Sequence, residues 1–149
     1  MKALRWYFIV IAHLIPVLSS LAQIPQLVMD INVGNEGSSP REPFVFQNKL
    51  YFVANDGING RELWQSDGTP EGTRMLKNIN PTGNSAPSAL TEFNGKIFFT
   101  ATEPEHGIEL WLTDGTESGT LMLKDIDTTA STGPTGLTVF KGMLYFAAD

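Results

Sequence analysis

Two Asp-Gly-Thr segments carry the carboxylates whose surroundings are richest in oxygen, at Asp67 and Asp114. Hydroxyl side chains lie on both sides of each aspartate, so either segment could offer oxygen ligands to Ca²⁺. The alternative is an Asx-turn, in which the carboxylate accepts a backbone N–H and fixes a hairpin. We favour the turn because the segment is repeated and because the spacing of an EF-hand loop is absent. The neighbouring hydroxyl residues are Ser66, Thr69, Thr113 and Thr116.

Glu62 and Glu109 each begin a Glu-Leu-Trp segment. Glycosidases use carboxylates in pairs, but an active site is usually unique, whereas these acids recur along the chain. We therefore expect both glutamates to accept hydrogen bonds from backbone donors or to pair with a lysine. The accompanying Trp64 and Trp111 are expected in the core, with stacking on a sugar as the alternative.

His106 could serve as the base for a nucleophilic serine or threonine. The residue aligned with it in the preceding repeat is Asn59, a polar turn residue, and no Gly-x-Ser-x-Gly nucleophile elbow occurs after residue 22. We therefore expect His106 to be a solvated turn residue.

Asp125 and Asp127 flank Ile126 in a way that could bind a cation weakly at a strand end. The aligned residues are amides or acids in the earlier repeats, a pattern that suits turn formation equally well. These aligned residues are Asn78 and Asn80, and before them Asp30 and Asn32. Together, these patterns predict no catalytic, cofactor-binding or metal-binding residue, no cofactor and no enzymatic activity.

The composition of the 149 residues excludes several classes of protein. The chain has no cysteine, which rules out disulfides, zinc–thiolate sites, iron–sulfur clusters and cysteine nucleophiles. Its net charge of −6 and the absence of a basic run argue against nucleic acid as a partner. No phosphate-binding Gly-x-x-x-x-Gly-Lys loop is present.

The first 22 residues have the pattern of a secretory signal peptide. Lys2 and Arg5 precede an apolar run, and Ser20-Leu21-Ala22 places small residues at positions −3 and −1 before Gln23. The 17 residues from Trp6 to Ala22 fall short of the ~20 that span a bilayer. We predict cleavage, export to the cell surface or medium, and no membrane attachment afterwards.

Residues 23–149 form a repeat with an offset of 47 residues. Between Glu62–Ile79 and Glu109–Ile126, 12 of 18 positions are identical without a gap. Flanking segments keep the offset, since Leu50-Tyr51-Phe52 aligns with Ile97-Phe98-Phe99 and then with Leu144-Tyr145-Phe146. A fixed period of this length is typical of propellers, solenoids and arrays.

Four short strands are expected in each repeat, and these strands must position the acids. In the second repeat they lie near residues 90–93, 96–102, 109–113 and 120–126, with a hairpin turn at Asn94-Gly95. The apolar second strand suits burial on both faces. Four strands in 40–50 residues predict an all-β protein with four-stranded antiparallel, propeller-like blades. An immunoglobulin-like sandwich or an open β-solenoid is the alternative.

The run Glu-Leu-Trp-x-Ser/Thr-Asp-Gly-Thr, followed by Gly-Thr and Leu-Lys-Asn/Asp-Ile, resembles the bacterial ELWxxDGT repeat family. The resemblance covers essentially all of residues 23–149. It implies propeller-like repeats in a secreted or surface protein, in bacteria that often export through a type IX system. The chain is shorter than is usual in the family and shows no C-terminal sorting domain.

The 127 residues after the signal peptide hold about 2.7 repeats, whereas closed propellers have typically 4–8 blades. We therefore expect an incomplete ring, in a protein that is truncated at its C-terminus or that completes the ring by self-association through unpaired blade faces. The expected function is surface display, adhesion or binding of an extracellular glycan or protein. The alternative is the propeller portion of a secreted, for example glycan-acting, hydrolase.

Overall fold

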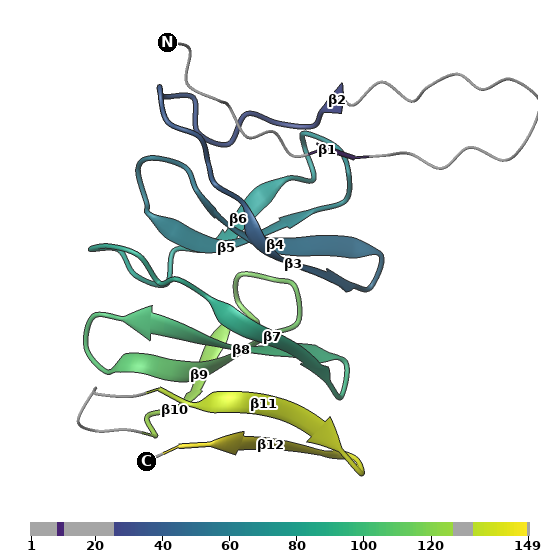
Figure 1. Ribbon diagram of the computed structural model, residues 1–149, viewed down its shortest axis with the longest axis vertical. Coiled ribbons are helices and arrows are strands. Elements are labelled where there is room, and N and C mark those ends of the chain that lie inside the picture. The colour runs from purple at the N-terminus through teal and green to yellow at the C-terminus, as the bar shows by residue number, and fades with distance from the viewer. Residues whose placement is uncertain (1–8, 11–25, 127–132, 149) are drawn as a thin grey trace, which may run out of the picture.

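The computed structural model describes residues 9–10, 26–126 and 133–148 (Figure 1). All regular elements in these residues are β-strands, so the predicted all-β class is confirmed. No helix of membrane-spanning length and hydropathy occurs in this part of the chain. The signal-peptide prediction concerns residues that lie outside it, apart from Ile9 and Val10, and Asp127 also lies outside.

Two four-stranded antiparallel sheets form the body of the molecule, and each follows the chain as a simple meander. The first sheet comprises β3 (Arg41–Phe46), β4 (Lys49–Asn55), β5 (Arg61–Ser66) and β6 (Arg74–Lys77). The second comprises β7 (Ser88–Phe93), β8 (Lys96–Glu103), β9 (Gly107–Thr113) and β10 (Leu121–Lys124). Two hairpin-sized sheets pair β11 (Thr135–Phe140) with β12 (Met143–Ala147), and β1 (Ile9–Val10) with β2 (Gln26–Leu27).

The strands reproduce the sequence repeat in register as well as in position. The hairpins β3–β4, β7–β8 and β11–β12 each contain a register shift near the start of their first strand. One residue in each shift has a positive φ, and these residues are Glu42, Ala89 and Gly136. The aligned cross-strand pairs are Phe44 with Tyr51, Thr91 with Phe98, and Thr138 with Tyr145.

The three hairpins also share one tight turn. Both turn residues have positive φ in each, as a type I′ turn requires. The sequence predicted this turn at Asn94-Gly95, and the structure places it there. The other two turns, at Gln47-Asn48 and Lys141-Gly142, follow the same geometry.

The strand bounds differ from those predicted mainly in the fourth strand. The sequence predicted residues 120–126, but β10 ends at Lys124. The Ile126 N–H is bonded to the carboxylate of Glu109 instead of to a strand partner. The second strand is buried on both faces as predicted, since the consecutive residues Phe99–Ala101 of β8 are buried, as are Tyr51–Ala54 of β4.

The two large sheets pack face to face along the long axis of the molecule (Figure 1). A buried apolar cluster fills the space between them and includes Tyr51, Leu76 and Trp111. A smaller cluster around Phe52 and Trp64 covers the opposite face of the first sheet, where Ile31 packs on it. The first strands β3, β7 and β11 contact one another in succession, so the sheets approach most closely along this row.

Candidate functional site

Each Asp-Gly-Thr segment forms a closed set of hydrogen bonds at the outer end of its sheet. Asp67 Oδ1 accepts from the Thr69 backbone N (2.9 Å) and from Thr69 Oγ1 (2.7 Å). The Thr69 hydroxyl oxygen accepts in turn from the Gly72 N–H at 3.0 Å. Asp114 makes the same two bonds with Thr116 at 2.9 and 2.7 Å. The predicted Asx-turn is therefore confirmed in both repeats.

These bonds lower the pKa of Asp67 below its usual value of 3.8, and the Thr69 hydroxyl is the largest cause. The pKa of Asp114 is lowered in the same way by Thr116. Both carboxylates are exposed and are ionised at neutral pH.

The hydroxyl groups next to these turns are bonded to each other. Ser66 Oγ lies 2.7 Å from Thr73 Oγ1, and Thr73 donates to the Thr69 carbonyl at 2.6 Å. Thr113 and Thr120 form the same buried pair in the second sheet, at 2.8 Å. The pairing of these hydroxyl groups was not predicted, although the repeated Gly-Thr dipeptide that contains Thr73 and Thr120 was a usable signal.

Glu62 is fully buried and joins the first sheet to the linker that leads into the second. Its carboxylate accepts from the backbone N–H groups of Ile79 (3.0 Å), Asn80 (3.3 Å) and Ser85 (3.3 Å). Ser85 Oγ donates a fourth bond at 2.6 Å. The expectation that this acid satisfies backbone donors is confirmed.

Burial raises the pKa of Glu62 above its ordinary value of 4.5, and the four donors offset part of that effect. Glu109, its counterpart in the second sheet, is also fully buried and accepts from the Ile126 N–H at 3.0 Å. The two glutamates belong to different sheets and each serves its own linker, so they do not form a glycosidase pair.

The two tryptophans lie in the core, as predicted. Trp64 is buried in the cluster on the outer face of the first sheet, and Trp111 is buried between the two sheets. The Lys77 ammonium lies 5.9 Å from the Trp111 ring centroid and donates to the Thr120 carbonyl at 2.8 Å. Neither indole Nε1 meets an acceptor among the described residues.

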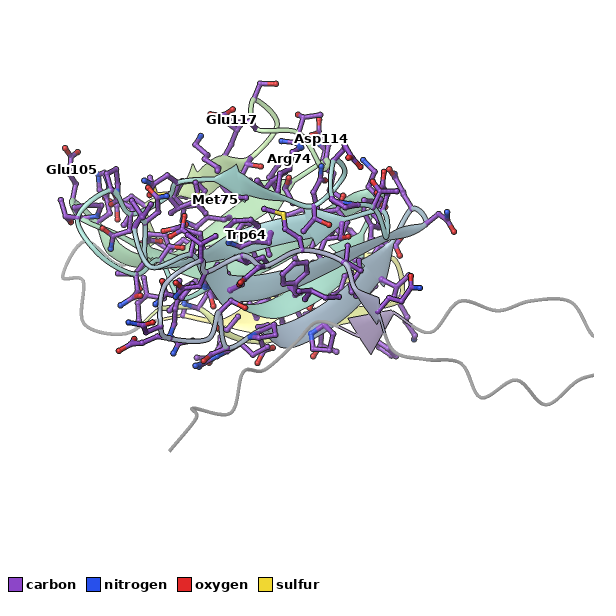
Figure 2. The ribbon with its side chains drawn as sticks, turned by 90° about the horizontal axis from the view of Figure 1, so that it is seen from above. Trp64, Arg74, Met75, Glu105, Asp114 and Glu117 are labelled. Atoms are coloured by element: carbon purple, nitrogen blue, oxygen red, sulfur yellow. The ribbon has the colours of Figure 1, made fainter. Side chains whose placement is uncertain are left out.

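A polar seam joins the first sheet to the Asp-Gly-Thr turn of the second. With its amide oxygen facing the Arg74 guanidinium (2.8 Å to Nη2), Gln65 donates to the Gly115 carbonyl at 3.1 Å. Burial and the Asp114 carboxylate raise the pKa of Tyr51, which lies at the same seam. Figure 2 shows Arg74, Asp114 and Glu117 together at one edge of the molecule. Sequence reasoning missed this seam because Gln65 and Arg74 are not repeated.

His106 is a turn residue, as expected, but it is paired with a carboxylate that was not predicted. It lies in the turn between β8 and β9, but its Nδ1 is 2.6 Å from Glu103 Oε1 and its ring is only partly exposed. This carboxylate raises the pKa of His106. Glu105, in the same turn, lies far from the polar seam in Figure 2. No serine or threonine hydroxyl is bonded to His106 among the described residues.

Two of the aligned amides at the other end of the sheets, Asn32 and Asn80, form turns, as expected. Asn80 Oδ1 accepts from the Thr82 N–H at 3.2 Å, and Asn32 Oδ1 accepts from the Gly34 N–H at 3.1 Å. Asn78 donates to Asn59 at 3.0 Å. One buried oxygen of Asp125 has no partner in the part of the chain that the structure describes.

Within the described ranges no group of three or more His, Cys, Asp or Glu residues could hold a metal ion. An open pocket between β3 and β7 contains one titratable side chain, that of Glu42. The pocket is otherwise lined by Pro43, Phe44, Ala89 and Leu90.

The arrangement as a whole is that of an all-β repeat scaffold whose recurring polar residues bond to the scaffold itself. No family model, no curated protein and no solved structure matches this chain.

Proposed function

We propose that this protein is an exported, non-enzymatic module of β-propeller-like repeats that binds glycans or proteins outside the cell. One observation carries the proposal. The acidic residues that could act as catalytic groups or metal ligands recur in both complete sheets. They accept the same internal hydrogen bonds in each, at Asp67 and Asp114 and at Glu62 and Glu109. Repeat scaffolds of this kind act through broad surfaces instead of one reacting centre.

The propeller-like arrangement rests on the sheet topology. Each complete sheet is a four-stranded meander, and the first strand of one sheet contacts the first strand of the next. Propeller blades place their first strands around a central axis in the same way. The sequence pattern shared with ELWxxDGT repeats supports the same geometry and supports export.

The binding function is tested on the purified chain with glycan and extracellular-protein arrays, together with hydrolysis assays on every glycan that binds. Saturable binding without turnover is expected. Turnover that disappears in a single-residue variant would instead support the secreted-hydrolase alternative. Binding of neither class of ligand would refute the proposal.

Export is tested separately, by expressing the full chain in a bacterial host and sequencing the N-terminus of the exported product. The pattern around Ser20-Leu21-Ala22 predicts a new N-terminus at Gln23. Retention of Met1 in a cell-associated product would contradict export by a cleaved signal.

A further inference from the structure

The two complete sheets carry different side chains at one aligned set of three positions. Each set links the turn between the second and third strands to the residue that follows the fourth strand. The first sheet has two amides and one acid there, whereas the second has an imidazole between two acids. The residues are Asp56, Asn59 and Asn78 in the first sheet, and Glu103, His106 and Asp125 in the second.

In the first sheet the three side chains form a chain of hydrogen bonds. The amide nitrogen of Asn59 donates to Asp56 Oδ2 at 2.6 Å, and the amide nitrogen of Asn78 donates to Asn59 Oδ1 at 3.0 Å. Asn59 is therefore a donor on one side and an acceptor on the other. An amide offers both functions at any pH, so this chain does not depend on the protonation of its central residue.

In the second sheet the corresponding chain is incomplete. His106 Nδ1 lies 2.6 Å from Glu103 Oε1. Asp125 Oδ1 is buried and has no hydrogen-bond partner among the described residues. The contact of the aligned Asn59 with Asn78 indicates that positions 106 and 125 approach each other in each sheet.

The chemistry of the second set requires two donors at its centre. An ionised carboxylate can only accept, so Glu103 and Asp125 each need an N–H from the residue between them. A neutral imidazole carries one N–H, whereas the imidazolium ion carries two. His106 can therefore donate to both carboxylates only when its ring is protonated.

We propose that His106 is a pH-dependent bridge, which holds Asp125 to the β8–β9 turn when the ring is protonated and releases it when the ring is neutral. The charged groups that act on the ring come from β8 (Glu103), from the same turn (Glu105) and from the segment after β10 (Asp125). All three are carboxylates and favour the imidazolium form. This bridge is independent of the binding function proposed above.

The direction of the pH dependence follows from the same groups. The hydrogen bond to Glu103 is the largest cause that raises the pKa of His106 above its ordinary value of 6.5. The bridge should therefore be fully formed below pH 6.5 and should be lost as the pH rises through the raised pKa. Its loss should be felt at Ile126, next to Asp125, whose N–H donates to the buried Glu109 carboxylate at 3.0 Å.

The first test is an NMR titration of the histidine rings in the full chain. Asp125→Asn should lower the pKa of His106, because it removes one of the two carboxylates. Glu92→Gln is the matched control, since Glu92 is an exposed acid of β7, and it should leave this pKa unchanged. His106→Asn identifies the signals, because His13 is the other histidine of the chain. An unchanged pKa in Asp125→Asn would overturn the proposal.

The second test is hydrogen exchange at the Ile126 amide, expressed as protection relative to an unstructured chain. Between about pH 5.5 and about pH 8.5 the protection in the wild type should fall by a factor of about three, the strength of a partly exposed ion pair. The double variant His106→Asn, Asp125→Asn copies the amides of the first sheet and should keep its protection over this range. The proposal is overturned if protection in the wild type stays constant or rises, or if it falls equally in the double variant.

Discussion

At the scale of single residues, the recurring acids accept hydrogen bonds from backbone groups of the scaffold around them. The repetition of Asp67 in the sequence was sufficient to predict an Asx-turn, whereas for Glu62 it left backbone donors and pairing with a lysine as two options. The sequence could not show which donors, because Ser85 lies 23 positions from Glu62 and meets it only through the path of the linker. The pair of His106 and Glu103 was missed because it occurs in one repeat only.

Gly72 is predicted to be indispensable to the Asp-Gly-Thr turn. A methyl group at this position would overlap the Asp67 carboxylate. Gly72→Ala should therefore lower the free energy of unfolding by about 2 kcal/mol, since it breaks the bonds of the turn. The nearest atom to a methyl group at Gly83 is 3.8 Å away. Gly83→Ala should change stability by less than about 0.5 kcal/mol, and equal effects in urea unfolding would contradict this account.

Removal of the Glu62 carboxylate should be the most damaging single change among the acids. Glu62→Ala leaves three buried backbone N–H groups without an acceptor, so we expect a loss of about 3 kcal/mol at neutral pH. Glu92, an exposed residue of β7, provides the control. Glu92→Ala should cost less than about 0.5 kcal/mol. Similar denaturation midpoints for the two variants would disprove the role of Glu62 as a linker anchor.

The stabilisation by Glu62 should also depend on pH. Its pKa in the folded state is raised above 4.5, so folding takes up a proton at this site. The difference in unfolding free energy between wild type and Glu62→Ala should be largest below about pH 4.5 and should decline as the pH rises through the folded pKa. A difference that grows with pH over this range would mean that folding lowers the pKa of Glu62, and it would contradict this prediction.

At the scale of elements, the positions of the hairpins could be predicted from the sequence. Their register shifts and the length of the fourth strand could not. The Asn94-Gly95 dipeptide predicts its own turn. Gln47-Asn48 adopts the same turn without glycine, and it is recognised only by alignment with the second repeat. The repeated register shifts at Glu42, Ala89 and Gly136 had no common residue type to reveal them. The length of the fourth strand was overestimated because the Ile126 N–H donates to the Glu109 carboxylate, 17 positions earlier in the chain, instead of to a strand partner.

Substitutions in the turn between β3 and β4 are therefore expected to raise the stability of the protein. Gln47 has φ 47° and Asn48 has φ 59°, a backbone region that favours asparagine and glycine. The double variant Gln47→Asn, Asn48→Gly copies the turn of the second repeat and should raise the free energy of unfolding by about 1 kcal/mol. Calorimetry checks this, and a lowered melting temperature would be evidence against a type I′ turn here.

At the scale of the whole molecule, the period of 47 residues predicted the stacking of similar sheets, and the all-β class is confirmed. The packing of Trp111 between the sheets follows from that repetition. The polar seam of Gln65, Arg74 and Gly115 does not follow from the repetition, because it depends on the relative position of the two packed sheets. The central claim is that the recurring acids stabilise this stack through the hydrogen bonds that they accept from it.

The most direct test of that claim compares the melting of two double variants, Asp67→Asn, Asp114→Asn and Asp67→Ala, Asp114→Ala, each with and without Ca²⁺. Asparagine keeps the oxygen that accepts from Thr69 and Thr116 but removes the charge, whereas alanine removes both. We predict that the alanine variant melts below the wild type and that the asparagine variant loses less than half as much in melting temperature, with no effect of Ca²⁺ on any form. Equal losses in both variants, together with a Ca²⁺-dependent rise in the wild-type melting temperature, would show that the carboxylates are metal ligands and would contradict the account.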